Sequence, residues 1–263
     1  MTAAAKPNQA RGTLYLVPTP LDFGCDELPP IEQVLPLGTL QTAANIGHWI
    51  TENAKSTRAF LKRVGDIAPL CQPMQAMVIT ALPREVHKKG DHTAGFDAAP
   101  LLQAALQGHD MGLVSEAGMP AIADPGASVV RAAHALGLRV VPLVGPVSLM
   151  LALAASGLNG QNFAFVGYLP QDNAARQQRL KELETLAQRT GQTQLFIETP
   201  YRNAVLWDAM LKGLQSQTRL ARASGLTLAN MQVQTHTVQA WRQSNDATSA
   251  DPMALPTVFA LGV

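Results

Sequence analysis

Short apolar runs alternate with amphipathic segments between Leu14 and Leu143. Each run has the length of a buried strand, and the segments between them, such as Ala98 to Leu106, have helical spacing of apolar residues. The predicted strands are Leu14 to Val17, Ala43 to Thr51, Ala76 to Thr80, Met111 to Val114 and Leu138 to Leu143. Strands that alternate with helices are typical of a parallel sheet covered by helices on both faces, so we predict an α/β domain here.

Two of the predicted helices start at recognisable capping residues. Ser56 is expected to cap a helix that carries Phe60, Leu61 and Val64 and ends at Gly65. Asp124 and Pro125 are expected at the N-cap and N1 positions of a second helix. The apolar face of that second helix is predicted from Val129, Val130, Ala133 and Leu136.

The remainder of the chain has a different order of elements. Strands are predicted at Phe163 to Val166, Gln194 to Ile197, Arg219 to Ala223, Gln232 to Val238 and Val258 to Leu261. A helix capped by Asp172 is expected to bury Leu180, Leu183, Leu186 and Ala187 and to expose Arg176, Arg179, Lys181 and Glu182. The helix after Pro200 is expected to bury Val205, Leu206, Met210 and Leu214. No helix is predicted among the later strands, which indicates a mixed or antiparallel sheet.

The segment Val144-Gly145-Pro146-Val147-Ser148 interrupts the pattern and is the best boundary between domains. We therefore predict an N-terminal α/β domain at 13–144 and a C-terminal α/β domain at 145–263, after a loose tail at 1–12. Ser148 is expected to cap the next helix, whose N-terminal amides suit a carboxylate or phosphate. No charged residue lies between Arg139 and Asp172, but the prolines and glycine of this stretch predict a buried core segment and not a membrane span.

The strand Met111 to Val114 ends in the polar turn SEAG, and the loop then continues to Gly126. Ligands of open parallel sheets bind at the carboxyl ends of the strands, so this loop is the first candidate for a small-molecule site. The loop after the first strand, through Pro20, should face the same crevice. A plain connector is the alternative, although this loop is longer than most that join a strand to a helix.

Composition and charge narrow the class of protein. The chain has 47% hydrophobic residues, which indicates a globular protein. Its net charge of +1 gives it no overall positive potential that would attract nucleic acid. RNA binding would need a local patch, and Arg58, Lys62 and Arg63, or the basic loop Arg84 to His92, are the candidates. Cys25 and Cys71 are far apart and form no CxxC motif, so we expect free thiols in a reducing, cytoplasmic location. The two histidines of the basic loop have no further ligand at a suitable spacing, so we expect no metal.

Four phrases occur in one order along the chain: LYLVPTPLDFG from Leu14, VSEAGMPAIADPG from Val114, RVVPLVGPVSLMLALAASGL from Arg139 and FIETPYR from Phe196. Together they resemble the tetrapyrrole methylase superfamily, and within it the branch of ribosomal RNA small-subunit methyltransferase I. The resemblance extends from Leu14 to Val263. Several long matches in order are far more specific than any one of them.

The resemblance implies a tetrapyrrole methylase-like fold of two α/β domains, a homodimer, and S-adenosylmethionine as the methyl donor. On this reading the cofactor is bound by Pro20, Ser115, Glu116, Ala117, Gly118, Met119, Pro120 and Ser148. Glu116 stands where the family usually has Asp, and Met119 where it has Thr. The substrate motifs depart further, since Leu21-Asp22-Phe23-Gly24 replaces the usual Gly-Asn-Leu.

The hypothesis that follows is a methyltransferase that acts on small-subunit ribosomal RNA, at a ribose 2′-hydroxyl. The alternatives are a methyltransferase with a small-molecule, tetrapyrrole-like acceptor and an inactive paralogue that still binds the cofactor. For a hydroxyl acceptor the reaction needs a proton acceptor, and Glu52 and Glu198 are hypothetical bases because each ends a predicted strand. A structural role for either glutamate remains the alternative.

Overall fold

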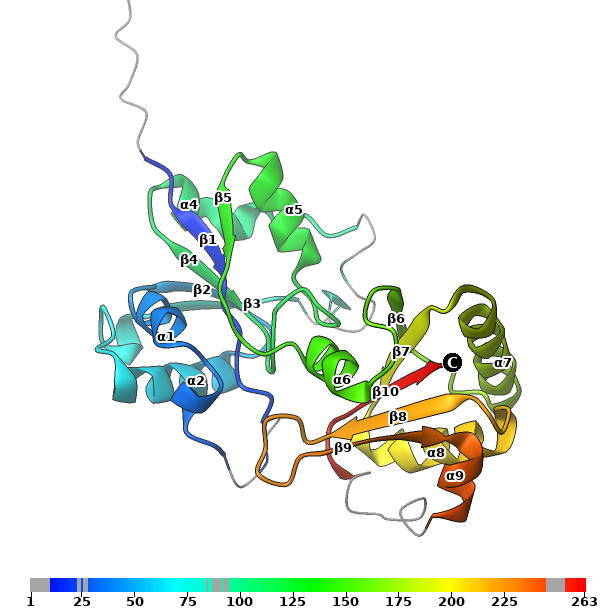
Figure 1. Cartoon of the computed structure of the whole chain (residues 1–263). Helices are drawn as coiled ribbons and strands as arrows, with labels where there is room; N and C mark the ends of the chain where they lie inside the picture. The colour runs from blue at the N-terminus through cyan, green and yellow to red at the C-terminus, as the bar shows by residue number, and fades with distance from the viewer. Residues whose placement is uncertain are drawn as a thin grey trace, which may run out of the picture. The chain divides into compact units, whose positions relative to one another are not determined.

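The computed structural model describes residues 10–22, 25, 28–83, 85–86, 91, 95–244 and 254–263 (Figure 1). Contacts between Cα atoms divide the chain into two compact units. The first contains the residues up to Pro20 and Pro30–Pro146, and the second contains Leu21–Pro29 and Val147–Val263. The predicted basic loop at 84–92 lies mostly outside the described residues.

The first unit is built on a five-stranded sheet in the order β3-β2-β4-β1-β5. All neighbouring strands are parallel, which confirms the predicted sheet type. The strands are β1 (Thr13–Leu16), β2 (His48–Thr51), β3 (Val78–Ala81), β4 (Met111–Val114) and β5 (Arg139–Pro142). The central strand β4 is buried along its whole length, as the continuous apolar run predicts.

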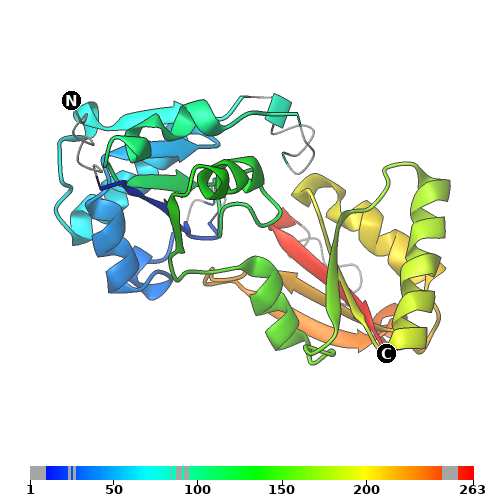
Figure 2. The same cartoon turned by 90° about the horizontal axis from the view of Figure 1, so that it is seen from above.

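Helices cover both faces of this sheet (Figures 1 and 2), and the helices of each face contribute to a separate apolar cluster. One contains residues of η1 (Ile31–Gln33), α1 (Leu37–Ala44) and α2 (Ala54–Ile67). The other contains residues of η3 (Ala99–Leu102), α4 (Gln103–Leu106) and α5 (Ala127–Ala135). A further short helix, η2 (Met74–Ala76), precedes β3.

Several boundaries in the first unit differ from the prediction. The expected strand at Ala43 to Thr51 is wrong in its first half, because Ala43 and Ala44 end α1 and only His48–Thr51 is extended. The helix α2 begins at Ala54, since the side chain of Asn53 and not that of Ser56 caps it by accepting a hydrogen bond from Lys55 N–H at 2.9 Å. The helix also continues through Gly65 to Ile67.

The second unit contains a five-stranded sheet in the order β6-β7-β10-β8-β9. The pair β6 and β7 is parallel and the other pairs are antiparallel, so the predicted mixed sheet is confirmed. Its strands are β6 (Phe163–Tyr168), β7 (Thr193–Glu198), β8 (Arg219–Ser224), β9 (Gln232–Thr237) and β10 (Thr257–Gly262). Its helices are α6 (Ser148–Ser156), α7 (Asn173–Thr190), α8 (Pro200–Gly213) and α9 (Val238–Gln243).

One apolar cluster joins α7, α8 and α9 to this sheet. The side chain of Asp172 caps α7 by accepting a hydrogen bond from Ala175 N–H at 2.8 Å, as predicted. Arg176 is buried and not exposed, because its guanidinium donates to Gln171 O and Asn173 Oδ1.

Two further expectations for this unit are wrong. Val205 is 55% exposed, and its neighbour Trp207 is buried in its place, against Trp241 and Phe259. The helix α9 lies between β9 and β10, where no helix was expected. Among the described residues, no helix has the length and apolar content that crossing a membrane requires.

Candidate functional site

The loops that follow β1 and β4 are hydrogen-bonded to each other. Thr19 N–H donates to Gly118 O at 2.9 Å and Gly118 N–H donates to Thr19 O at 3.0 Å, which forms an isolated antiparallel bridge. We call the residues Ser115 to Pro120 the β4 turn. Gly118 can take part because its φ of 73° lies in the left-handed region that glycine adopts without strain. Two loops far apart in the sequence therefore form one local structure.

This pair of loops lies at a reversal of strand order. From β1 the chain crosses β4 to reach β2, whereas from β4 it crosses β1 to reach β5, so the connections after these two neighbouring strands run in opposite directions across the sheet. In open α/β sheets the crevice at such a reversal, beyond the carboxyl ends of the strands, is where ligands bind. The β4 turn therefore lies where open α/β sheets generally bind their ligands.

The structure brings together most of the residues singled out from the sequence. Pro20, Ser115, Ala117, Gly118 and Pro120 are buried in the first unit, while Glu116 and Met119 are partly exposed. Ser148 belongs to the second unit and is the first residue of α6. Its predicted capping role is wrong, since the N-cap is Val147 and has no side-chain bond.

The loop after β2 also contacts the β4 turn. Glu116 N–H donates to Glu52 Oε2 at 3.2 Å, and Asn53 Nδ2 donates to Glu116 Oε1 at 2.7 Å. Asn53 thereby links the turn to α2, which the same side chain caps. Loops from three strands, β1, β2 and β4, converge on one turn.

Asp124 is a partly buried carboxylate beside the β4 turn and is not the cap that the sequence predicted. Helix α5 begins after Gly126, which occupies the N-cap position. Burial, followed by the charge of Glu52, raises the pKa of Asp124 to about 7; a hydrogen bond from Ser115 opposes the shift and Glu116 adds to it.

The acceptor that caps α5 is Asp91, which the sequence reading missed. Its Oδ2 accepts hydrogen bonds from Gly126 N–H and Ser128 N–H, each at 2.8 Å, and from Ser128 Oγ at 2.7 Å. Burial alone would raise the pKa of Asp91, but the bonds from Ser128 and Gly126 outweigh it and the pKa is lowered. An aspartate inside a basic, polar segment gives no signal that it caps a helix so much later in the chain.

The raised pKa of Asp124 predicts how stability depends on pH. The folded state holds the Asp124 proton up to about pH 7, whereas the unfolded chain, with a reference pKa of 3.8, releases it earlier. Wild-type stability should therefore fall as pH rises through this window. We expect Asp124→Asn to be more stable than wild type, and the difference in their free energies of unfolding should be about 2–3 kcal/mol larger at pH 8 than at pH 5, as measured by urea unfolding. Asp66→Asn, on the exposed side of α2, controls for the loss of one carboxylate, and an identical gain at both pH values would contradict the assignment.

Glu198 has a structural environment within the second unit. Its Oε2 forms an ion pair with Arg202 Nη2 at 2.7 Å, and its Oε1 accepts a hydrogen bond from Thr199 N–H at 2.8 Å. The side chain of Glu198 is 3% exposed. Both oxygens thus have partners that hold the start of α8 against β7.

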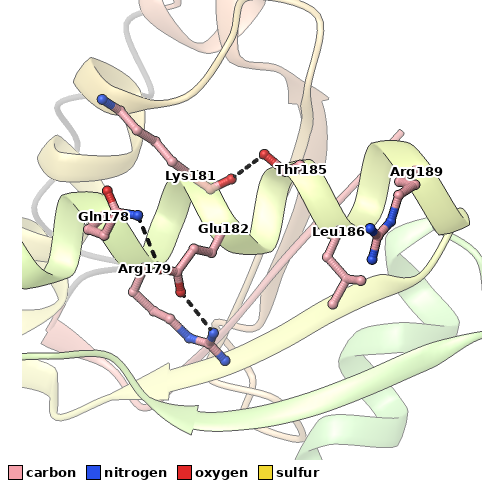
Figure 3. Close-up of a pocket in the computed structure, with 7 residues that line it drawn as sticks. All are labelled: Gln178, Arg179, Lys181, Glu182, Thr185, Leu186 and Arg189. Atoms are coloured by element: carbon pink, nitrogen blue, oxygen red, sulfur yellow. Dashed lines mark hydrogen bonds and ion pairs between the residues drawn. The ribbon is translucent and has the colours of Figure 1, made fainter.

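A surface depression along α7 lacks the features of a binding site. It is lined by Gln178, Arg179, Lys181, Glu182, Thr185, Leu186 and Arg189, all from one helix (Figure 3). Arg179 and Glu182 pair with each other there at 3.2 Å, and no second element supplies groups that converge on a ligand. Within the described ranges, no cluster of three or more His, Cys, Asp or Glu side chains could hold a metal ion.

Comparison with solved structures identifies the class of fold. The methyltransferase CobJ matches 95% of this chain and 94% of its own, with a TM-score of 0.54 at 15% sequence identity. The likeness at this identity shows the fold alone, and it is the tetrapyrrole methylase fold that the sequence motifs predicted. No protein-family model matches the chain.

Comparison with curated proteins identifies the family. The ribosomal RNA small subunit methyltransferase I of Mesorhizobium japonicum is 33% identical over 228 residues, which are 86% of this chain and 68% of that protein. The protein of the same name from Xylella fastidiosa is 33% identical over 193 residues, 73% of this chain and 60% of that protein. The chain belongs to the ribosomal RNA small subunit methyltransferase I family, and it spans only part of the length of these relatives.

Proposed function

We propose that this protein is an S-adenosylmethionine-dependent methyltransferase that acts on small-subunit ribosomal RNA, at a ribose 2′-hydroxyl. The observation that carries the proposal is the match to the Mesorhizobium japonicum protein across 86% of the chain. The hydrogen-bonded loops at the strand-order reversal support it, because ligands of open α/β sheets bind at such reversals.

The residues around the β4 turn suit S-adenosylmethionine. The donor is a sulfonium cation, and the turn is accompanied by the carboxylates of Glu52 and Glu116 and by the carboxyl group of Asp124, which keeps its proton up to about pH 7. Negative charge near a partly buried site favours a cationic ligand. On this proposal the peptide groups of Ser115 to Pro120, together with Pro20, hold the donor.

Methyl transfer from a sulfonium to a hydroxyl is an in-line displacement. The bound donor supplies an electrophilic methyl group. The protein has to hold the acceptor oxygen in line with it, exclude water, and take up the proton that the hydroxyl loses. The bridge between Thr19 and Gly118 provides the rigidity that such alignment needs.

The two hypothetical bases, Glu52 and Glu198, differ in their surroundings, so their replacement is expected to have different effects. Glu198→Gln should leave kcat within about threefold of wild type but lower stability by about 1–3 kcal/mol, because it breaks the pair with Arg202. Glu52→Gln should lower kcat by about 10²–10⁴ while keeping an oxygen that can accept from Glu116 N–H. Steady-state kinetics and urea unfolding of both variants measure these effects. An unchanged kcat for Glu52→Gln would remove Glu52 as the proton acceptor.

Transfer of a labelled methyl group tests the function as a whole. We expect label from S-adenosylmethionine in the RNA of bacterial small ribosomal subunits and none in a tetrapyrrole offered in its place. Calorimetry with the donor alone separates an inactive cofactor-binding protein from one that has lost the site. The same preparations, in sedimentation velocity, test the further proposal of a homodimer.

A further inference from the structure

Three cations lie along one exposed side of α2. Lys55, Arg58 and Lys62 are all exposed, and their spacing of three and four residues places them on the same side of a helix. Arg63, which the sequence analysis grouped with Arg58 and Lys62, is only partly exposed. We call Lys55, Arg58 and Lys62 the α2 cation face.

All three of these cations lack a carboxylate partner among the described residues, unlike some cations on other helices. Arg179 pairs with Glu182 on α7, and Lys212 pairs with Asp208 on α8. Among the residues that the structure describes, Lys55 and Lys62 form no ion pair, and Arg58 donates only to the helix carbonyl of Ala54 at 3.3 Å. Asp66, four residues after Lys62, is exposed but does not pair with it. The charge of the α2 cation face is therefore available to a ligand.

The α2 cation face begins next to the candidate site. Asn53 caps α2 and donates to Glu116 in the β4 turn at 2.7 Å. The first cation, Lys55, is two residues further on, and the face extends about 10 Å along the helix to Lys62. The face and the β4 turn thus belong to one unit, and the residue that caps α2 is hydrogen-bonded to the turn.

We propose that the α2 cation face binds the phosphate backbone of the RNA whose ribose is methylated, an inference that rests on the proposed function. The carboxylates at the β4 turn, Glu52 and Glu116, repel phosphate, so the acceptor strand has to be held by groups outside the turn. With a net charge of +1, the protein as a whole supplies no attraction for a polyanion. Unpaired cations next to the turn supply that attraction locally, and a length of about 10 Å accommodates successive phosphates of one strand.

The test replaces the three cations together, in the full chain, with Lys55→Gln, Arg58→Gln and Lys62→Gln. We expect the affinity for a small-subunit ribosomal RNA transcript to fall about tenfold or more at 0.1 M salt. We also expect the slope of log K against log salt to become shallower by about 2, since each lost phosphate contact on a single strand contributes about 0.7. Binding of S-adenosylmethionine, measured by calorimetry, should be unchanged.

A matched variant with Arg179→Gln, Lys181→Gln and Arg189→Gln removes the same charge from α7 and should bind RNA like the wild type. If the α2 variant binds and methylates RNA like the wild type, the α2 cation face is not the RNA contact, although the proposed function stands. An equal loss in both variants would show that only net charge matters, which also overturns the proposal. If wild-type protein binds the donor but neither binds nor methylates RNA, the proposed acceptor is wrong and this inference fails with it.

Discussion

Replacement of Gly118 by proline is expected to abolish binding of S-adenosylmethionine. Proline removes the N–H that bonds to Thr19 O at 3.0 Å, and it fixes φ near −65° where Gly118 has a φ of 73°. Both changes break the bridge between the loops after β1 and β4. We expect calorimetry to detect no donor binding at millimolar concentrations, and methyl transfer to be lost with it.

Gly118→Ala is the matched variant at the same position. Alanine keeps the N–H but adopts a positive φ at a cost of about 1–2 kcal/mol, so donor affinity should fall without disappearing. Circular dichroism and urea unfolding report whether each variant is folded. A folded Gly118→Pro protein that binds the donor like the wild type would exclude the β4 turn as the donor site.

Replacement of Asp91 by alanine is expected to be the most destabilising of the side-chain truncations considered. The change leaves three buried donors at the start of α5 without their acceptor: Gly126 N–H, Ser128 N–H and Ser128 Oγ. Loss of a buried, charged acceptor costs about 3–5 kcal/mol. Urea unfolding at pH 7 should show a loss of this size.

The lowered pKa of Asp91 sets the pH at which this loss is seen. A carboxylate whose folded pKa is below its reference value of 3.8 stabilises the protein above that pH, and the stabilisation disappears as pH falls through the folded pKa. The cost of Asp91→Ala should therefore be complete at pH 7 and shrink in acid. Asp97→Ala is the control, because Asp97 accepts a single hydrogen bond, from Ala99 N–H, at an exposed position. Its cost should stay near 1 kcal/mol, and an equal cost for the two variants would contradict the role given to Asp91.

The parts of the fold that depend on local pattern were predictable from the sequence. The apolar run Met111 to Val114 is β4 with the same bounds, and Asp172 caps α7 as its position before an amphipathic segment indicates. The alternation of strands and helices also predicted the parallel sheet. In such a sheet the polar β4 turn lies at the carboxyl ends of the strands.

The parts that depend on tertiary contacts were not predictable. Asp124 has the sequence context of an N-cap, but an acceptor from a distant segment, Asp91, takes that role and leaves Asp124 beside Glu52. Helix α1 was missed because Pro36 at its N-cap has no capping side chain and the segment lacks charged residues that would mark an exposed face. Arg176 seemed exposed by helical spacing, yet local acceptors such as Gln171 O allow it to be buried. The link from Asn53 to Glu116 likewise joins residues that no sequence pattern connects.

The pairing of β1 with β4 and β5 has a consequence for how the protein matures on the ribosome. Thr19 and Ser115 are 96 positions apart, and both neighbours of β1 in the sheet are synthesised long after it. A nascent chain that has not yet exposed β4 therefore leaves β1 without a neighbour in the sheet, and the bridge between Thr19 and Gly118 cannot form. The first unit therefore assembles late in translation, when the growing polypeptide already extends past Pro142.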